Sequence, residues 1–323
     1  MKPPACIMMQ RDEDDLLAPW LAYHGYLFGF ENLYVVDNGS THSVTLDTIR
    51  RFQAVGVNFD LSHSRMGDYE KKGEITKQII NTLAEQGRHD IYLPLDCDEF
   101  VVSLGASGLT CSRNDIWAQL EPLASARGVL VVPTLLWNAP GDPTAFYFQD
   151  QQKVFFSGGG VDHLDHGNHH GGVPGAAPRR ARSVGYLHFH NRSFVELRNR
   201  ALEKLKNRVD IEDREKLLAY KGHGDHLIRY FTMTEDDYVR YFATRDIVDF
   251  PGFMALLAVL GVDEGLRRAT YTSAAPERTG AVFPAEFDGA AYWDANPDVA
   301  ELGTPGLLHY FRHGKRERRR LKR

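Results

Sequence analysis

The sequence predicts an α/β fold in which a Rossmann-like, mostly parallel sheet is flanked by helices and followed by a helical C-terminal extension. Through the first third of the chain, short apolar segments alternate with segments that carry apolar residues at helical spacing. Several apolar segments end in a carboxylate, as at Asp37, Asp60 and Asp96. Ligands bind at the carboxyl ends of strands in open α/β sheets, so we expect a polar site at this edge.

The elements of this first third follow in a regular order. The sequence predicts a strand over 4–10, a helix over 15–29, a strand over 32–40, a helix over 46–56, a strand over 57–63, a helix over 73–87 and a strand over 91–102. Asp14 or Asp15 is available to cap the first helix, and Gly87 is placed to end the third.

The middle of the chain continues with a helix over 113–125 and a strand over 128–137. Residues 157–175 form a Gly- and His-rich stretch without periodicity, which is typical of a functional or disordered loop. A strand then leads into a helix within 183–208, where Ser193 and Glu196 form a predicted capping box. Residues 210–274 are amphipathic and helical by pattern, and 274–289 is a predicted linker.

Composition limits the class of protein. Hydrophobic residues make up 43% of the 323 residues and charged residues 25%, as in ordinary globular proteins. No run approaches the roughly 20 apolar residues that span a bilayer, and the apolar N-terminal patch is too short for a secretion signal. The cysteines at positions 6, 97 and 111 show no metal-binding spacing, so a cytoplasmic, reducing location is predicted.

The last nine residues, 315–323, contain seven Lys or Arg and one Glu, although the net charge of the chain is −5. A basic tail can contact the anionic inner face of a membrane peripherally. The alternative is a solvated terminus, and nucleic-acid binding is unlikely without a base-reading motif.

Asp96, Asp98 and Glu99 follow an apolar run directly, in the segment LPLDCDEFVV. Buried carboxylates are costly unless they pair with cations or hold a metal. A D-x-D pair at a strand end can hold Mg²⁺ or Mn²⁺ against a diphosphate, because these ions prefer oxygen ligands and leave positions for phosphates. The alternative is a loop of solvated carboxylates paired with arginines.

Three motifs occur in collinear order: RDEDDLLAPWLAYHGYLFGF, then LYVVDNGST, then the acidic segment. Together they resemble the bacterial glycosyltransferases of the family-2-like and family-92-like group, which have the A-type nucleotide-sugar-binding fold. The resemblance covers roughly residues 2–207 and rests on these matches: Glu13, Trp20, His24, Gly25, Asp37, Asn38, Ser40, Thr41, Asp96, Asp98, Glu99 and Phe100.

The resemblance implies roles for these residues. The nucleotide donor is expected to contact Asp37, with Asn38 beside it, and Asp96, while Asp98 is the expected metal ligand. Glu99 is a candidate catalytic residue, or a hydrogen-bond acceptor for the acceptor sugar or a loop. The further donor-binding candidates are Glu13, Lys77, Gln78 and His169, although a lysine on a helix surface is more often solvated.

Six histidines lie between positions 163 and 190. In this group a late histidine completes the metal site, which implies that His188 or His190 binds Mn²⁺ or Mg²⁺ together with Asp98. Both histidines would share one face of a strand, so spacing does not choose between them. An inverting transfer also needs a general base, for which Asp162 and Asp165 are the candidates and Asp142 a further one.

The C-terminus resembles a short module appended to bacterial surface-polysaccharide glycosyltransferases. Its expected apolar core is Tyr292, Trp293, Leu307, His309, Tyr310 and Phe311, with Asn296 and Asp298 in a turn. The predicted division is a catalytic domain over 1–208, a helical extension over 209–280 and this module with its basic tail over 281–323.

The resemblance implies a metal-dependent, inverting glycosyltransferase that moves a sugar from a nucleotide-diphosphate donor, expected to be a UDP-sugar, to a glycan or lipid-linked glycan. One alternative is a catalytically inactive polysaccharide-binding or scaffold protein. A nucleotidyltransferase is less favoured, because the segment after the first strand is acidic where that class has a basic, Gly-rich loop.

Overall fold

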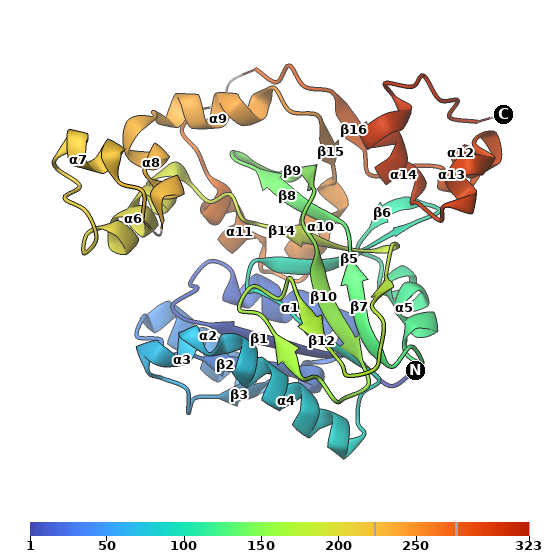
Figure 1. Ribbon diagram of the computed structural model, residues 1–323, viewed down its shortest axis with the longest axis horizontal. Coiled ribbons are helices and arrows are strands. Elements are labelled where there is room, and N and C mark those ends of the chain that lie inside the picture. The colour runs from blue at the N-terminus through green and yellow to red at the C-terminus, as the bar shows by residue number, and fades with distance from the viewer. Residues whose placement is uncertain (223, 275–276, 323) are drawn as a thin grey trace.

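The computed structural model describes residues 1–222, 224–274 and 277–322 (Figure 1). Its first sheet has seven strands in the order β13-β7-β10-β4-β1-β2-β3. Their bounds are β1 Ala5–Gln10, β2 Leu33–Asp37, β3 Asn58–Asp60, β4 Ile91–Pro94, β7 Gly128–Val132, β10 Lys153–Ser157 and β13 Arg179–Arg180.

Strands β1 to β4 run parallel to one another, and β10 runs antiparallel to both β4 and β7. The helices that connect the parallel strands are α1 Leu17–Phe28, α2 Ser43–Gln53 and α4 Lys72–Gln86, with the short α3 Met66–Glu70 and the 3₁₀ turn η1 Phe30–Asn32 beside them. Parallel strands joined by helices and closed by an antiparallel strand form the expected A-type arrangement, so the predicted fold class is confirmed.

The second sheet also has seven strands, in the order β16-β15-β9-β8-β14-β5-β6. Their bounds are β5 Glu99–Gly105, β6 Gly108–Thr110, β8 Leu135–Ala139, β9 Asp142–Gln149, β14 Val184–His188, β15 Ile247–Asp249 and β16 Val282–Pro284. A small hairpin of β11 His163–Leu164 and β12 Gly171–Gly172 lies in the Gly- and His-rich stretch. Helix α5 Arg113–Leu120, followed by η2 Glu121–Leu123, packs near β5.

Two predicted strands are each divided between the two sheets. The prediction of one strand over 91–102 is wrong, because β4 ends at Pro94 in the first sheet and β5 begins at Glu99 in the second. The 128–137 segment likewise contains β7 and β8, separated at Pro133 and Thr134. Both sheets are buried, so the apolar pattern continues across each break, and only the carboxylates and a proline without an N–H mark the change of sheet.

The two faces of the first sheet are buried against different partners. One face carries Ala5, Ile7 and Tyr92 and packs on Ile80 and Leu83 of α4. The alternate residues of the same strands face a larger core that contains α1 and residues of the second sheet. Strands buried on both faces account for the nearly continuous apolar runs of the sequence.

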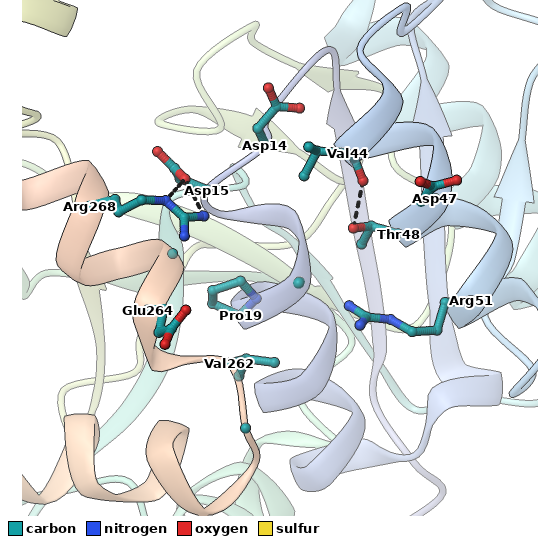
Figure 2. A pocket seen from close by; sticks show the side chains of 13 residues that line it. Asp14, Asp15, Pro19, Val44, Asp47, Thr48, Arg51, Val262, Glu264 and Arg268 are labelled. Atoms are coloured by element: carbon teal, nitrogen blue, oxygen red, sulfur yellow. Dashed lines mark hydrogen bonds and ion pairs between the residues drawn. The ribbon is translucent and has the colours of Figure 1, made fainter.

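The helix ends agree only in part with the predicted caps. Leu16 is at the N-cap of α1 and makes no side-chain cap. The two predicted capping residues bind elsewhere: Asp14 accepts a hydrogen bond from the Thr45 hydroxyl at 2.6 Å, and Asp15 pairs with Arg268 at 2.8 Å (Figure 2). Gly87 does end α4, with φ of 63°.

The predicted capping box at the start of α6 Phe194–Leu205 forms in one direction. The Ser193 hydroxyl accepts from the Glu196 N–H at 3.2 Å. The Glu196 carboxylate pairs instead with Arg200 at 2.8 Å.

The C-terminal third contains helices and two strands of the second sheet. After α6 come α7 Arg214–Ala219, η3 Asp225–Leu227, α8 Arg229–Thr232, α9 Glu235–Ala243, α10 Pro251–Val259 and α11 Asp263–Thr270. Strand β15 pairs with β9 and β16 pairs with β15, so the expected helical extension and the expected module both contribute to this sheet. The three-part division of the chain stays a prediction.

The last segment folds into α12 Gly289–Ala295, α13 Pro297–Glu301, α14 Gly306–His309 and a final turn, Tyr310–Gly314, at the opposite end of the molecule from α6 to α8 (Figure 1). Tyr292 and Leu307 are buried, as predicted for an apolar core. Residues 275 and 276 of the predicted linker and residue 323 of the basic tail lie outside the described residues.

Gly73 in α4 lies against the backbone of the Gly- and His-rich stretch. A Cβ at this position would be 2.1 Å from the Leu164 carbonyl oxygen, whereas a Cβ at Gly67 in α3 would meet nothing within 4 Å. We expect Gly73→Ala to reduce the free energy of unfolding by about 1 to 3 kcal/mol through overpacking. Gly67→Ala, the matched control, is expected to be neutral or to stabilise by up to about 1 kcal/mol. Equal urea midpoints for the two variants would contradict this packing.

His24 is fully buried among aromatic rings of the core, including Trp20 and Phe100. Its Nδ1 is 3.0 Å from the Trp20 carbonyl oxygen and its Nε2 accepts from the Val101 N–H at 3.4 Å. Burial lowers the pKa of His24 to about 3, so the folded chain holds this ring neutral.

This burial predicts a pH dependence of stability. The unfolded chain binds a proton at His24 below about pH 6.5, whereas the folded chain does so only near pH 3, so stability falls as the pH drops between these values. His24→Gln should remove a slope of up to about 1.4 kcal/mol per pH unit from urea unfolding between pH 6 and 4. The exposed His313→Gln is the control. Identical slopes for wild type and His24→Gln would show that the ring is not held neutral.

Candidate functional site

Residues Leu95 to Asp98 connect the two sheets and carry the acidic motif. The Leu95 N–H donates to the Ile7 carbonyl of β1 at 2.9 Å, and the Phe189 N–H after β14 donates to the Asp98 carbonyl at 2.8 Å. Within the turn, the Asp96 N–H donates to Glu99 Oε2 at 2.9 Å. The connection is therefore held at both ends, at the carboxyl end of β4, where the sequence predicted a polar site.

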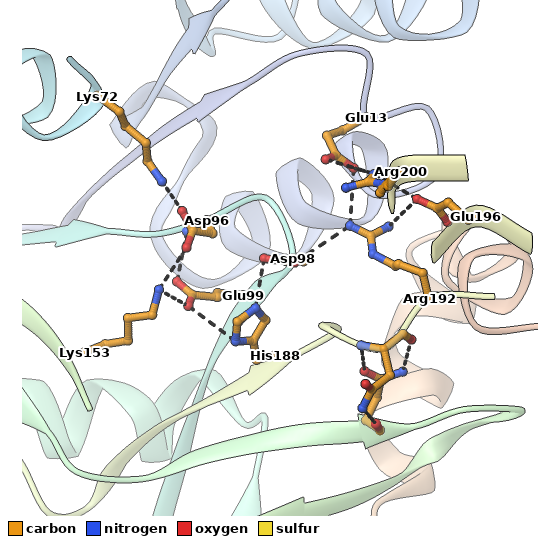
Figure 3. A network of polar contacts seen from close by, with 12 residues as sticks. Glu13, Lys72, Asp96, Asp98, Glu99, Lys153, His188, Arg192, Glu196 and Arg200 are labelled. Carbon is orange, nitrogen blue, oxygen red and sulfur yellow. Dashed lines mark hydrogen bonds and ion pairs between the residues drawn. The ribbon is translucent and has the colours of Figure 1, made fainter. Parts of the chain in front are cut away.

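Two buried lysines contact Asp96 (Figure 3). Lys72 Nζ pairs with Asp96 Oδ1, and Lys153 Nζ lies 2.8 Å from Asp96 Oδ2. Burial alone would raise the pKa of Asp96, but the two ammonium groups hold it well below its usual range. Burial alone would likewise lower the pKa of Lys153, but Glu99 and Asp96 raise it. Asp96 and Lys153 are therefore both charged at neutral pH.

Glu99 is fully buried behind this pair. Its Oε1 is 2.6 Å from Lys153 Nζ, and Lys153 also donates to the Gly167 carbonyl at 2.6 Å. Glu99 is thus placed to hold Lys153 and the turn at Asp96 in position, and its predicted catalytic role stays a prediction.

Asp98 and His188 face each other from the two sides of the site (Figure 3). His188 Nε2 is 3.4 Å from Asp98 Oδ1, and Arg192 Nη2 is 3.8 Å from Asp98 Oδ2. Burial opposes ionisation of Asp98, but His188 and Arg192 lower its pKa, and Asp98 in turn raises the pKa of the buried His188. Among the residues that the structure describes, the second His188 nitrogen, Nδ1, has no hydrogen-bond partner, and it lies 3.8 Å from Glu99 Oε1.

His190 lies beside His188, with ring centroids 5.3 Å apart, and stacks on Trp137 at 3.9 Å. The predicted metal-binding residues Asp98, His188 and His190 are therefore neighbours. In the ranges 1–222, 224–274 and 277–322, no group of three or more His, Cys, Asp or Glu side chains is arranged to hold a metal ion. Asp98 and His188 offer a carboxylate oxygen and an imidazole nitrogen, which are ligand types that Mn²⁺ accepts, and metal binding by them stays a prediction.

Glu13 extends the chain of charges away from Asp98. It lies 3.3 Å from Arg192 Nη2 and 3.4 Å from Arg200 Nη2. Arg192 is almost fully buried and Arg200 also pairs with Glu196, so α6 is joined to the acidic connection by alternating charges (Figure 3).

A cavity of about 990 Å³ opens over this network. Its walls come from the ends of β1, β2 and β4, from α6, and from the Gly- and His-rich stretch. Seven of the predicted site residues line it: Glu13, Asn38, Asp96, Asp98, His169, His188 and His190.

Asp37 does not line the cavity. Its carboxylate is buried and accepts from Gln10 Nε2 and from the Ser40 hydroxyl, each at 2.5 Å. The Asn38 amide donates to the carbonyls of His63 and Arg65 at 2.6 and 2.9 Å. Both residues therefore hold the loop after β2 in place, and direct donor contact by Asp37 stays a prediction.

The predicted helix and loop residues lie around the cavity rather than in its wall. Lys77 pairs with Glu74 at 2.5 Å and Gln78 is exposed. Asp162 pairs with His163 at 2.8 Å. Asp165 accepts from the His169 N–H at 2.7 Å and so positions a residue that does line the cavity.

The further candidate base, Asp142, caps a turn instead. It accepts from the Thr144 N–H at 3.0 Å.

The cations of the network were missed by sequence reasoning. Lys153 stands directly before the apolar strand residues 154–156, and a lysine in that position is a signal for a buried charge. Lys72 begins a helix and looks like an ordinary surface residue, so the sequence carries no signal for it. Arg192 follows the two late histidines in the HFHNRS segment, and its closeness to them in sequence was the available clue.

No protein-family model and no curated protein sequence matches this chain. Among solved structures, S. aureus TarS 1-349 in complex with UDP is similar at 17% identity and a TM-score of 0.27, over 44% of this chain and 36% of that one. Another S. aureus TarS 1-349 structure aligns over 99% of this chain and 92% of that one, at 14% identity and a TM-score of 0.31. A mycobacterial protein aligns over 44% and 43%, at 17% identity and a TM-score of 0.25.

The buried network predicts a large effect of removing Lys153. Lys153→Met leaves the buried Glu99 and the half-buried Asp96 without their shared cation, which should cost about 3 to 5 kcal/mol in the free energy of unfolding. Adding Glu99→Gln to that variant should cost less than the sum of the two single changes, because the pair is coupled. Lys77→Met, which removes a partly exposed ion pair, is the control and should cost about 1 kcal/mol or less. Additive losses in urea unfolding would show that Lys153 and Glu99 do not interact.

Proposed function

We propose that this chain is a metal-dependent glycosyltransferase that moves a sugar from a nucleotide-diphosphate donor to a glycan acceptor, with inversion, in surface polysaccharide synthesis. The observation that carries the proposal is the pair of Asp98, on the connection between the two sheets, and His188, at the end of β14, which both line a cavity of about 990 Å³. The collinear motifs of the first 100 residues support the same class.

The wall of this cavity suits a nucleotide diphosphate. Cationic side chains of Arg11, Lys72, Arg200 and Lys204 line it together with the carboxylates of the acidic motif. Cations close to a diphosphate would stabilise its negative charge, and the charge-assisted hydrogen bonds that they donate are stronger than neutral ones. Asn38, at the end of β2, is the candidate for contact with the nucleoside.

Asp98 and His188 are the residues that would hold Mg²⁺ or Mn²⁺. When bound, such an ion would neutralise the charge of the departing diphosphate. Glu99, behind His188, would accept a hydrogen bond from Nδ1 and so direct Nε2 to the ligand position. Arg192 would balance the charge of Asp98 from the other side.

The acceptor hydroxyl must lose its proton as it attacks the anomeric carbon. Asp162 and Asp165 remain the proposed bases, and both lie on the stretch that forms one wall of the cavity. Because neither side chain lines the cavity, this role requires the stretch to move toward the acceptor.

We propose that the donor is a UDP-sugar and that the chain acts at the cytoplasmic face of the membrane, with 315–322 in peripheral contact. No helix of the described part of the chain is long and apolar enough to cross a bilayer. Part of the tail is already paired within the chain, since Arg319 lies 2.8 Å from Asp298 and Lys315 lies 3.6 Å from Asp246. Arg316 and Arg318, which form no ion pair with the described residues, would make the membrane contact.

The proposal predicts metal-dependent donor hydrolysis by the purified protein. Across UDP-, GDP-, dTDP- and CMP-sugars with Mn²⁺ or Mg²⁺, one donor should be hydrolysed, and Asp98→Ala should reduce that rate by at least about 100-fold. Asp47→Ala, an exposed carboxylate on α2 that pairs with Arg50, is the control and should keep the wild-type rate. Full hydrolysis by Asp98→Ala with unchanged metal dependence would refute the proposed role.

A further inference from the structure

Two further hollows continue from the catalytic cavity along the surface. A cavity of about 650 Å³ shares Gln151 and His169 with it. This second cavity shares Arg180 with a third one, of about 590 Å³, which extends to Arg182 and Gly303. Because each hollow shares wall residues with the next, the three adjoin one another, and the second and third together are here called the arginine groove.

Positive charge dominates the arginine groove. Its walls carry Arg180, Arg182 and Arg312 but a single carboxylate, Asp150, which already pairs with Arg312 at 2.9 Å. No ion pair links Arg180 or Arg182 to a carboxylate within the described ranges, and both side chains are exposed. Arg180 and Arg182 are therefore available to an anionic ligand, although the net charge of the chain is −5.

The backbone fixes how these arginines are presented. Arg180 ends β13, which pairs with β7, and the Ala181 N–H donates to the Val131 carbonyl at 2.8 Å. Ala181 is buried, whereas Arg180, at the end of β13, and Arg182, in the turn that leads to β14, are both exposed and both line the third hollow. Arg179 faces the other way and lines none of the three hollows.

The cleft between α1, α2 and α11 shows that this charge is not a general property of the surface (Figure 2). That cleft, of about 410 Å³, is lined by four carboxylates and two arginines. One of its arginines, Arg268, already pairs with Asp15. The four carboxylates of that cleft would repel an anionic chain, whereas the arginine groove would attract it.

We propose that the acceptor of this enzyme is an anionic glycan, bearing carboxylate or phosphate groups, which lies along the arginine groove with its growing end in the catalytic cavity. The identification of the ligand as an acceptor rests on the proposed function, whereas the groove and its charges follow from the positions of the lining residues. The C-terminal module forms part of the groove through Arg312 and Gly303, so it takes part in acceptor binding.

Arginine suits this role because its planar guanidinium donates two parallel hydrogen bonds to a carboxylate or phosphate. Arg180 and Arg182, which line the same hollow, can meet neighbouring charged groups of a polymer. The His169 ring, fixed by its Nδ1 at 2.7 Å from the Gln152 carbonyl oxygen, lies where the groove enters the catalytic cavity.

The test measures by calorimetry how tightly oligosaccharides bind to the full chain when no donor is present. The probes are an oligogalacturonate, a phosphate-bearing oligosaccharide and a neutral malto-oligosaccharide of equal length. The expected result is binding of at least one anionic probe that weakens with added salt, and no binding of the neutral one. Arg180→Ser/Arg182→Ser should weaken anionic binding by about tenfold or more, Arg180→Lys/Arg182→Lys should retain part of it, and Arg179→Ser should bind as wild type.

Several results would overturn the inference: equal binding of the neutral probe, no binding of either anionic probe, or an equal loss in Arg179→Ser. Equally tight binding of a single-stranded oligonucleotide or of vesicles with anionic lipid, lost in the same double variant, would assign the groove to another polyanion.

Donor hydrolysis separates this inference from the proposed function, since the double variant should hydrolyse donor at the wild-type rate. If the wild type hydrolyses a donor but binds no anionic probe, the acceptor role of the arginine groove is wrong and the proposed enzyme activity stands. If it binds an anionic probe but hydrolyses no donor, the anion-binding role of the groove stands and the proposed enzyme activity is wrong.

Discussion

The ion pairs that join Lys153 to Asp96 and Glu99 are the interaction on which the rest of the site depends. They lie where the chain passes from one sheet to the other, and they hold together β4, β5 and β10. A buried charge without a partner is strongly destabilising, so these groups persist only as a complete set. Because the turn between Asp96 and Glu99 is held in this way, Asp98 is directed outward to meet His188 at the cavity. The same network that supports the turn therefore orients the proposed metal ligands.

Sequence reasoning placed the parallel strands, the connecting helices and the acidic motif correctly, because those depend on local periodicity and on turn residues. Gly87 ends its helix, and the late strand with His188 leads into a helix as expected. The position of the acidic motif at the carboxyl end of β4 also followed from the pattern. These features are decided within about ten residues of sequence, which is the range that hydrophobic spacing reports.

What the sequence did not predict depends on contacts between distant segments. Residues 91–102 and residues 128–137 each contribute one strand to each sheet. The hydrophobic pattern does not show this change of sheet, because the strands on both sides of it are buried. Lys72 meets Asp96 only after the chain has folded, and Arg200 meets Glu13 across 187 positions. Asp14 does not cap the first helix, and its carboxylate accepts a hydrogen bond from the Thr45 hydroxyl on another helix instead. Long-range pairing of charges thus determined the site, while local patterns determined the scaffold.

The central claim is that Asp98 and His188 together bind a divalent ion in the presence of a nucleoside diphosphate. The most direct measurement is the NMR spectrum of protein labelled in its fourteen histidine rings, with Mn²⁺ added in the presence and absence of a nucleoside diphosphate. The resonance of His188, assigned with His188→Gln, should broaden at low Mn²⁺ only when the nucleotide is present, and before most other histidines. An unaffected His188 resonance, or uniform broadening of all histidines, would contradict the account.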